Sequence, residues 1–145
     1  MIIDLVNETD LLVDTYLLEK IAEDLTQRQI ELIITDNEGI RALNSKHRSI
    51  DKATDVLSFP LGGKEHPAMP LGAIVISKEF VEAKAAELGH TKQEELTLLF
   101  IHGLLHLVGY DHEMDEGQMR HKEEVIIDAW QLPKSLIVRN EEDEV

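Results

Sequence analysis

Three histidines within one short segment have the spacing of a metal site. His102 and His106 are four residues apart, so on a helix they project from one face with Cβ atoms about 5–6 Å apart. His112 follows Gly109, a residue type that commonly ends a helix in the left-handed conformation and lets the chain turn back. Three neutral imidazoles with an open fourth position are typical of a catalytic zinc site. The segment therefore predicts one zinc ion per chain held by His102, His106 and His112, although nickel and copper also suit nitrogen ligands.

The alternative is a buried helix that carries histidines without a metal. Apart from the two histidines, nearly all residues between 96 and 108 are apolar, which is typical of a helix inside a core. An imidazole without a partner in such a place costs roughly a few kcal/mol, and two on one face cost more. A shared cation removes that cost, so the metal site is the favoured interpretation.

Length, composition and charge narrow the class of protein. The chain has 145 residues, 43% of them hydrophobic and 30% charged, as in a globular domain. It has no cysteine, so a metal must be held by histidines and carboxylates. The N-terminus lacks the pattern of a secretory signal, and no apolar run is long enough for a membrane span. A cytoplasmic protein without a membrane partner is expected.

The net charge of −15 argues against broad, nonspecific attraction to nucleic acid. The charge is uneven, however. Residues 41–52 carry Arg41, Lys46, Arg48 and Lys52 against the single acid Asp51. A local basic groove therefore remains compatible with the acidic composition.

Periodicity and capping signals predict four strands and five helices around these residues. Strands are expected at residues 2–6, 30–35, 54–59 and 73–76, the third stopped by Pro60. Helices are expected from the cap Asp10 to about residue 25, at 38–46 after Asp36, between Ser77 and Gly89, from a Thr91–Glu94 capping box through the histidines, and at about 116–130.

This order predicts an α+β fold with a single mixed four-stranded sheet packed with about five helices, and a metal site on a helix and the turn that follows it. Residues 1–138 are expected to form one metallohydrolase domain. Residues 139–145 are mostly acidic and are expected to form a disordered tail.

The histidine segment contains half of a known peptidase pattern. His106-x-x-Gly109-x-x-His112 matches the end of the extended zinc-peptidase motif, His-Glu-x-x-His-x-x-Gly-x-x-His. The residue after His102 is Gly103, which cannot serve as the general base that the peptidase glutamate supplies. The pattern therefore keeps the metal ligands and loses the proteolytic group.

The segment His-Gly-Leu-Leu-His-Leu-Val-Gly-Tyr-Asp-His, residues 102–112, resembles the signature of the YbeY family of bacterial metal-dependent endoribonucleases. A second segment, Arg-Ser-Ile-Asp-Lys-Ala-Thr-Asp-Val-Leu-Ser-Phe-Pro at residues 48–60, is similar to the other characteristic block of that family. Chain length and element order also fit, so the resemblance covers nearly the whole chain. One departure is Ala73, where family members often have aspartate.

The resemblance implies a zinc-dependent endoribonuclease specific for single-stranded RNA. It implies a role in ribosomal RNA maturation, at the 3′ end of 16S rRNA, and in ribosome quality control, with the ribosome or its small subunit as partner. It carries His102, His106 and His112 over as zinc ligands and Arg48 as the catalytic-site arginine.

The chemistry of these residue types agrees with a phosphodiesterase. Zinc acidifies water and polarises phosphoryl oxygens, and a guanidinium binds phosphoryl oxygens in a planar, two-pronged way. Asp111 is expected to hold an imidazole, and the RNA 2′-hydroxyl is a candidate nucleophile. Two other classes stay open: a zinc hydrolase of another bond, peptide or small molecule, and a non-catalytic ribosome-associated factor that uses its metal for stability.

Overall fold

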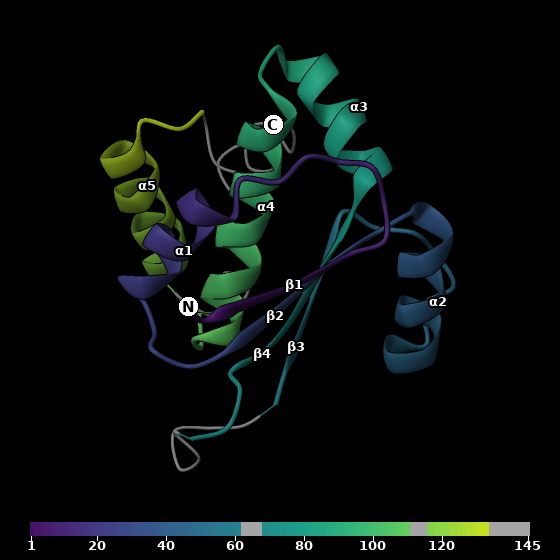
Figure 1. Cartoon of the computed structure of the whole chain (residues 1–145), viewed down its shortest axis with the longest axis horizontal. Helices are drawn as coiled ribbons and strands as arrows, with labels where there is room; N and C mark the ends of the chain where they lie inside the picture. The colour runs from purple at the N-terminus through teal and green to yellow at the C-terminus, as the bar shows by residue number, and fades with distance from the viewer. Residues whose placement is uncertain (62–67, 111–115, 134–145) are drawn as a thin grey trace.

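The computed structural model describes residues 1–61, 68–110 and 116–133 of the chain. His112 and Asp111, the expected domain boundary at residue 138 and the expected tail at 139–145 lie outside the described residues. The described residues form one mixed four-stranded sheet with five helices, which confirms the predicted fold class (Figure 1).

The sheet has the strand order β1-β2-β4-β3. Its strands are β1 (Ile3–Asn7), β2 (Ile30–Thr35), β3 (Val56–Pro60) and β4 (Gly72–Ser77). β1, β2 and β4 run parallel, whereas β3 pairs antiparallel with β4 and forms one edge of the sheet. The two central strands, β2 and β4, are mostly buried and rich in isoleucine, which suits strands covered on both faces.

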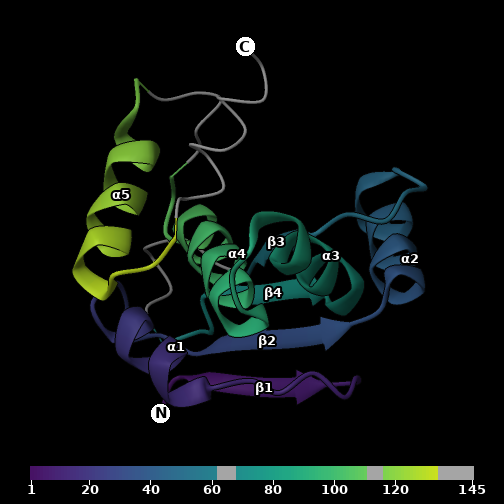
Figure 2. The same ribbon diagram turned by 90° about the horizontal axis from the view of Figure 1, so that it is seen from above.

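The helices cover the two faces of the sheet unequally. They are α1 (Thr15–Glu23), α2 (Asn37–Arg48), α3 (Lys78–Leu88), α4 (Lys92–Leu107) and α5 (Gln118–Trp130). α2 lies by itself on one side of the sheet, while α4 packs on the other side with α1 and α5 beside it (Figures 1 and 2). Alternation along β4 produces this division: Ile74 and Ile76 pack in the large core under α4, and Val75 packs in a smaller core under α2.

The histidine helix α4 is the centre of the fold. Twelve of its 16 residues are buried, and its apolar side chains contribute to both cores on that side of the sheet. The predicted capping box is confirmed: the Thr91 hydroxyl accepts from the Glu94 N–H, and the Glu94 carboxylate accepts from the Thr91 N–H. No helix of the described residues has the length and apolarity needed to cross a membrane.

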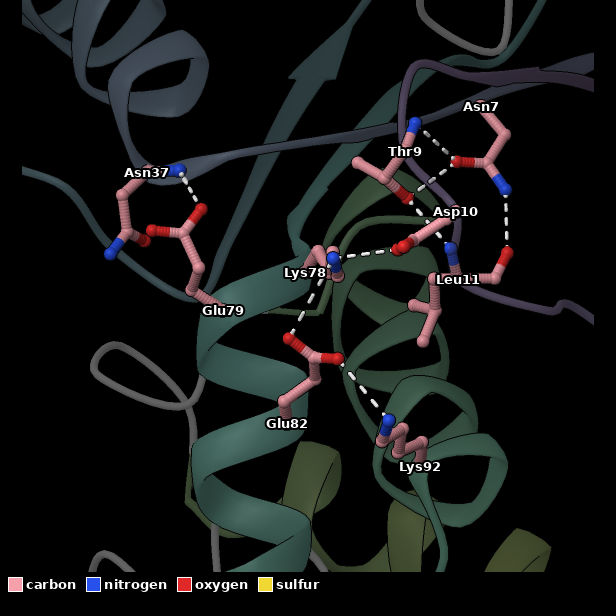
Figure 3. Close-up of polar contacts among 9 residues, drawn as sticks. All are labelled: Asn7, Thr9, Asp10, Leu11, Asn37, Lys78, Glu79, Glu82 and Lys92. Atoms are coloured by element: carbon pink, nitrogen blue, oxygen red, sulfur yellow. Dashed lines mark hydrogen bonds and ion pairs between the residues drawn. The ribbon is translucent and has the colours of Figure 1, made fainter.

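The first helix begins later than the sequence predicted. Asp14, not Asp10, caps α1, and its carboxylate accepts from the Leu17 N–H. The expectation was wrong because the Asn7 side chain holds the preceding segment in a turn. Its oxygen accepts from the Thr9 N–H and hydroxyl, and its amide donates to the Leu11 carbonyl (Figure 3).

Asp10 instead connects three segments of the fold. Its carboxylate pairs with the Lys78 ammonium at 2.6 Å, and Glu82 pairs with both Lys78 and Lys92 (Figure 3). The hydrogen bond and charge of Lys78 hold the pKa of Asp10 below its ordinary value, and the same hydrogen bond raises the pKa of Lys78. The loop before α1 is thereby tied to the starts of α3 and α4.

Other boundaries differ from the predicted ones as well. β3 starts two residues later than expected and ends one residue later, at Pro60, which an edge strand tolerates because an outward N–H is not needed there. α2 continues through Arg48, so this arginine ends a helix and does not lie in a loop. α5 starts at Gln118, after Gly117 with φ of 102°, and not at Glu116.

Candidate metal centre

His102 and His106 lie together on α4, as their spacing predicted. Their ring centroids are 4.8 Å apart, and the two Nε2 atoms are 3.3 Å apart. His102 is buried and His106 is half-buried. The two Nε2 atoms therefore lie close enough to serve as two ligands of one metal ion.

The turn after α4 orients His106. Gly109 adopts φ of 109°, its N–H donates to the His106 carbonyl, and the Tyr110 N–H donates to the Leu105 carbonyl. These two bonds form a Schellman motif, which returns the chain toward the helix. The Tyr110 carbonyl thereby lies 3.1 Å from His106 Nδ1. Because a carbonyl can only accept, Nδ1 carries a proton, and Nε2 of a neutral ring can then act as a ligand.

A buried carboxylate faces the other histidine. Glu123 Oε2 on α5 lies 3.6 Å from His102 Nδ1, and the Glu123 side chain is fully buried. A proton on Nδ1 is favoured beside this carboxylate, and it leaves a lone pair on Nε2 of His102 as well. Two lone pairs 3.3 Å apart repel each other unless a metal cation or a proton lies between them.

The spacing fits a zinc ion. Two nitrogens bound to one zinc at about 2.0–2.1 Å, with a tetrahedral angle between them, lie about 3.3 Å apart. This is the separation of the two Nε2 atoms. Within residues 1–61, 68–110 and 116–133, no group of three or more ligating side chains occurs. The described pair therefore needs a further ligand from elsewhere, and the predicted third ligand, His112, lies outside the described residues.

Close packing against the sheet explains why residue 103 is a glycine. Its carbonyl accepts from the Ser58 hydroxyl at 3.0 Å, and an added Cβ would lie 2.9 Å from Ile74 Cγ2 and 3.0 Å from Ser58 Oγ. The position faces the sheet and not the space between the histidines. A glutamate there, as in the zinc peptidases, would collide with β3 and β4.

Arg48 lies at the end of α2, on the opposite side of β3 from the histidine helix α4. It is exposed at the end of α2 and forms no hydrogen bond or ion pair with another described residue. The neighbouring His47 ring packs against Phe59 at 5.1 Å between centroids. Since Phe59 faces α2, the preceding residue, Ser58, faces α4 and contacts it at Gly103. Arg48 and His102 therefore flank the same edge strand, although no contact joins them.

The basic segment is less charged than the sequence indicated. Arg41 and Asp51 form a two-pronged ion pair, with N–O distances of 2.7 and 3.0 Å. Lys46, Arg48 and Lys52 are exposed near the end of α2 and after it. The cations available to an anionic ligand are thus these three, without Arg41.

Sequence reasoning missed Glu123, although a signal existed. Met119, Ile126 and Ile127 stand four residues before and three and four residues after it, and all three are buried. The position of Glu123 is thus on the apolar stripe of its helix, where a carboxylate needs a specific reason. Ala73, the expected departure from the family resemblance, pairs with Phe59 and shares the face of Val75, so it lies on the α2 side of the sheet.

The fold and site define an α+β protein with a close pair of imidazoles on a buried helix. The model of the family Endoribonuclease YbeY matches residues 5–131. The chain belongs to this family, and its class is therefore that of endoribonucleases. The resemblance seen in the sequence is confirmed.

Individual relatives match over nearly their whole length. The chain is 59% identical to an Endoribonuclease YbeY of Sulfurovum sp. (strain NBC37-1), with 97% of this chain and 98% of the relative covered. It is 56% identical to one of Sulfurimonas denitrificans, with 96% and 99% covered. A solution structure from Thermotoga maritima has a TM-score of 0.59 and 29% identity, covering 89% of this chain and 91% of that one.

Proposed function

We propose that this chain is a zinc-dependent endoribonuclease that cuts single-stranded RNA in the cytoplasm. The observation that carries the proposal is the pair of Nε2 atoms 3.3 Å apart on α4. Membership in a family of endoribonucleases supports RNA as substrate. We further propose ribosomal RNA, at the 3′ end of 16S rRNA, as the target, with roles in ribosome quality control and the ribosome or its small subunit as partner.

His102 and His106 would hold the ion through Nε2, with His112 as the third ligand. A bound zinc ion supplies Lewis acidity toward a phosphoryl oxygen and acidifies water. The Tyr110 carbonyl keeps the His106 proton on Nδ1, away from the side where a metal is held. Burial of His102 limits the access of bulk water to that imidazole.

Arg48 would bind the phosphoryl group of the RNA. Its guanidinium is exposed and has no carboxylate partner among the described residues, unlike that of Arg41. A guanidinium pairs with two phosphoryl oxygens at once, so Arg48 can orient the scissile phosphate and stabilise its developing charge. Lys46 and Lys52 would attract the flanking phosphates.

A comparison of three substrates tests the proposal. The purified protein should cut an unstructured RNA, leave casein intact, and lose its RNA cleavage in the presence of a chelator. Cleavage of casein would favour a peptidase, and cleavage of a chromogenic phosphodiester without cleavage of RNA would favour a small-molecule hydrolase. Metal binding without any cleavage would favour a non-catalytic factor.

The metal is tested separately by elemental analysis of untagged protein, which should find about one zinc ion per chain. A His102→Ala, His106→Ala double variant should lose it. A His121→Ala variant is the matched control, because His121 is an exposed histidine on α5. Full metal content in the double variant would rule this site out.

A further inference from the structure

Glu123 differs from the other buried glutamates of the described residues. Glu19 accepts hydrogen bonds from the N–H groups of Ile2 and Ile3, at 3.1 and 2.5 Å. Glu95 accepts from His90 Nε2 at 2.8 Å. Neither oxygen of Glu123 has a hydrogen-bond partner among the described residues, and His102 Nδ1 lies 3.6 Å from Glu123 Oε2. A carboxylate buried in this way is costly unless it acts on a neighbouring group.

The two histidines are oriented by different acceptors. His106 Nδ1 has the Tyr110 carbonyl, which the Schellman turn after α4 brings back to it. His102 Nδ1 has the Glu123 carboxylate, which α5 brings from a different part of the chain. The His106 contact is a hydrogen bond, whereas the Glu123 carboxylate faces His102 Nδ1 as a nearby charge at 3.6 Å, beyond hydrogen-bond distance. In each ring the acceptor is beside Nδ1, and the two Nε2 atoms face each other. An imidazole that binds metal through one nitrogen commonly donates its other N–H to a carboxylate or a carbonyl.

We propose that Glu123 is the positioning residue of His102: its carboxylate holds the proton on Nδ1 and so presents Nε2 to the metal. This inference rests on the proposed metal site and adds a residue to it. Without Glu123, His102 can place its proton on Nε2 and donate it to His106 Nε2, which lies 3.3 Å away. His102 Nε2 would then carry the proton and His106 Nε2 would accept it, so a metal ion could bind only after this hydrogen bond is broken.

The first test measures the histidine tautomer in the metal-free protein. Long-range proton–nitrogen NMR spectra of the full chain should show His102 protonated on Nδ1 in the wild type. In Glu123→Gln, the amide can either accept from Nδ1 or donate to it, so the preference should weaken. Glu124→Gln is the matched control, because it removes the same charge from the adjacent residue, which pairs with Arg120 at 3.2 Å. A wild-type His102 protonated on Nε2 would overturn the inference.

The second test measures zinc affinity by competition with a chromophoric chelator. Glu123→Gln should weaken zinc binding about 10–100-fold, Glu123→Asp should restore part of it, and Glu124→Gln should bind as the wild type does. A folded Glu123→Gln protein with wild-type affinity would overturn the inference. If Glu123→Gln does not fold, the inference is tested by the His102 tautomer of the wild type and by the zinc affinity of Glu123→Asp. If the wild type binds no zinc, the proposed function fails, while the NMR result still decides the role of Glu123.

Discussion

At the scale of single residues, the site depends on which atom of each side chain is left available. His106 and His102 present Nε2 because acceptors stand beside their Nδ1 atoms. Arg48 is available because no acid pairs with it among the described residues, while Arg41 on the same helix is held by Asp51. Residue type alone would rank the two arginines as equals.

Arg48→Ala should nearly abolish RNA cleavage while the fold and the bound metal remain. Removal of a charged donor that meets developing phosphoryl charge typically costs about 10²–10³ in rate. Arg48→Lys should restore cleavage only in part, since lysine lacks the planar fork. Single-turnover cleavage of an unstructured RNA measures the rate, with metal content and circular dichroism as checks.

Arg41→Ala is the control for Arg48, because it removes an arginine of the same helix that already has a partner. It should change the rate little. Cleavage by Arg48→Ala at the wild-type rate would refute the catalytic assignment and would move Arg48 to a role in docking or to none.

Gly103→Ala should destabilise the protein although alanine favours helices. The new Cβ would lie 2.9 Å from Ile74 Cγ2 and 3.0 Å from Ser58 Oγ. Overpacking costs about 1–3 kcal/mol, and the gain in helix propensity offsets roughly 1 kcal/mol of it. Urea unfolding should therefore show a net loss of about 0–2 kcal/mol.

The Gly103→Ala, Ser58→Ala double variant separates the causes, because it removes one of the two close contacts together with the hydrogen bond to the Gly103 carbonyl. Its loss of stability should be smaller than the sum for the two single variants. A more stable Gly103→Ala protein would show that the helix can move away from the sheet at no cost.

At the scale of elements, the starts of α3 and α4 and the loop before α1 are joined by ion pairs on the surface. Asp10, Lys78, Glu82 and Lys92 form a chain across these three segments (Figure 3). The sequence gives no sign of it, because Asp10 and Lys78 are far apart along the chain. The turn built around Asn7 places Asp10 there instead of at a helix cap.

Asp10→Asn should make the stability of the protein less dependent on acidic pH. The hydrogen bond and charge of Lys78 lower the pKa of Asp10 in the folded state, so this carboxylate stabilises the fold above its unfolded pKa of about 4. That contribution is lost as the pH falls through the folded pKa. Urea unfolding across the acidic range should therefore show that the free energies of unfolding of the wild type and the variant converge at low pH.

Asp4→Asn is the matched control, since Asp4 is exposed on β1 and has no ion pair with the described residues. The effect of Asp10→Asn should shrink in high salt, because the pair is exposed. A difference between wild type and variant that grows toward low pH would contradict the assignment.

At the scale of the whole molecule, the net charge of −15 has to be reconciled with an RNA substrate. The exposed cations Lys46, Arg48 and Lys52 gather at the end of α2 and in the segment after it. Because Arg41 is neutralised by Asp51, this patch is small. Few phosphates would be neutralised, so RNA affinity should fall with salt along a shallow slope.

Lys46→Glu, Lys52→Glu should weaken RNA binding, as measured by fluorescence anisotropy across a salt series. Lys20→Glu, Lys84→Glu is the matched control, because it changes the net charge equally at lysines of α1 and α3, outside residues 41–52. Equal losses in both double variants would indicate a net-charge effect, and unchanged binding in the first would place the RNA elsewhere.

The sequence by itself determined the order of elements, the capping box of α4, the pairing of His102 with His106 and the family. These features depend on periodicity, capping and motifs, which act over a few neighbouring residues. The turn at Gly109 was likewise readable, because its left-handed geometry follows from the residue type.

Only the tertiary structure decided which distant residues meet. It brought Glu123 on α5 to His102 on α4, placed Asp10 beside Lys78, and set Gly103 against Ser58 and Ile74. It also put Arg48 and the histidines on opposite sides of β3, the edge strand. The physical reason is that strand order and helix packing, which no local pattern encodes, determine which side chains far apart in sequence become neighbours.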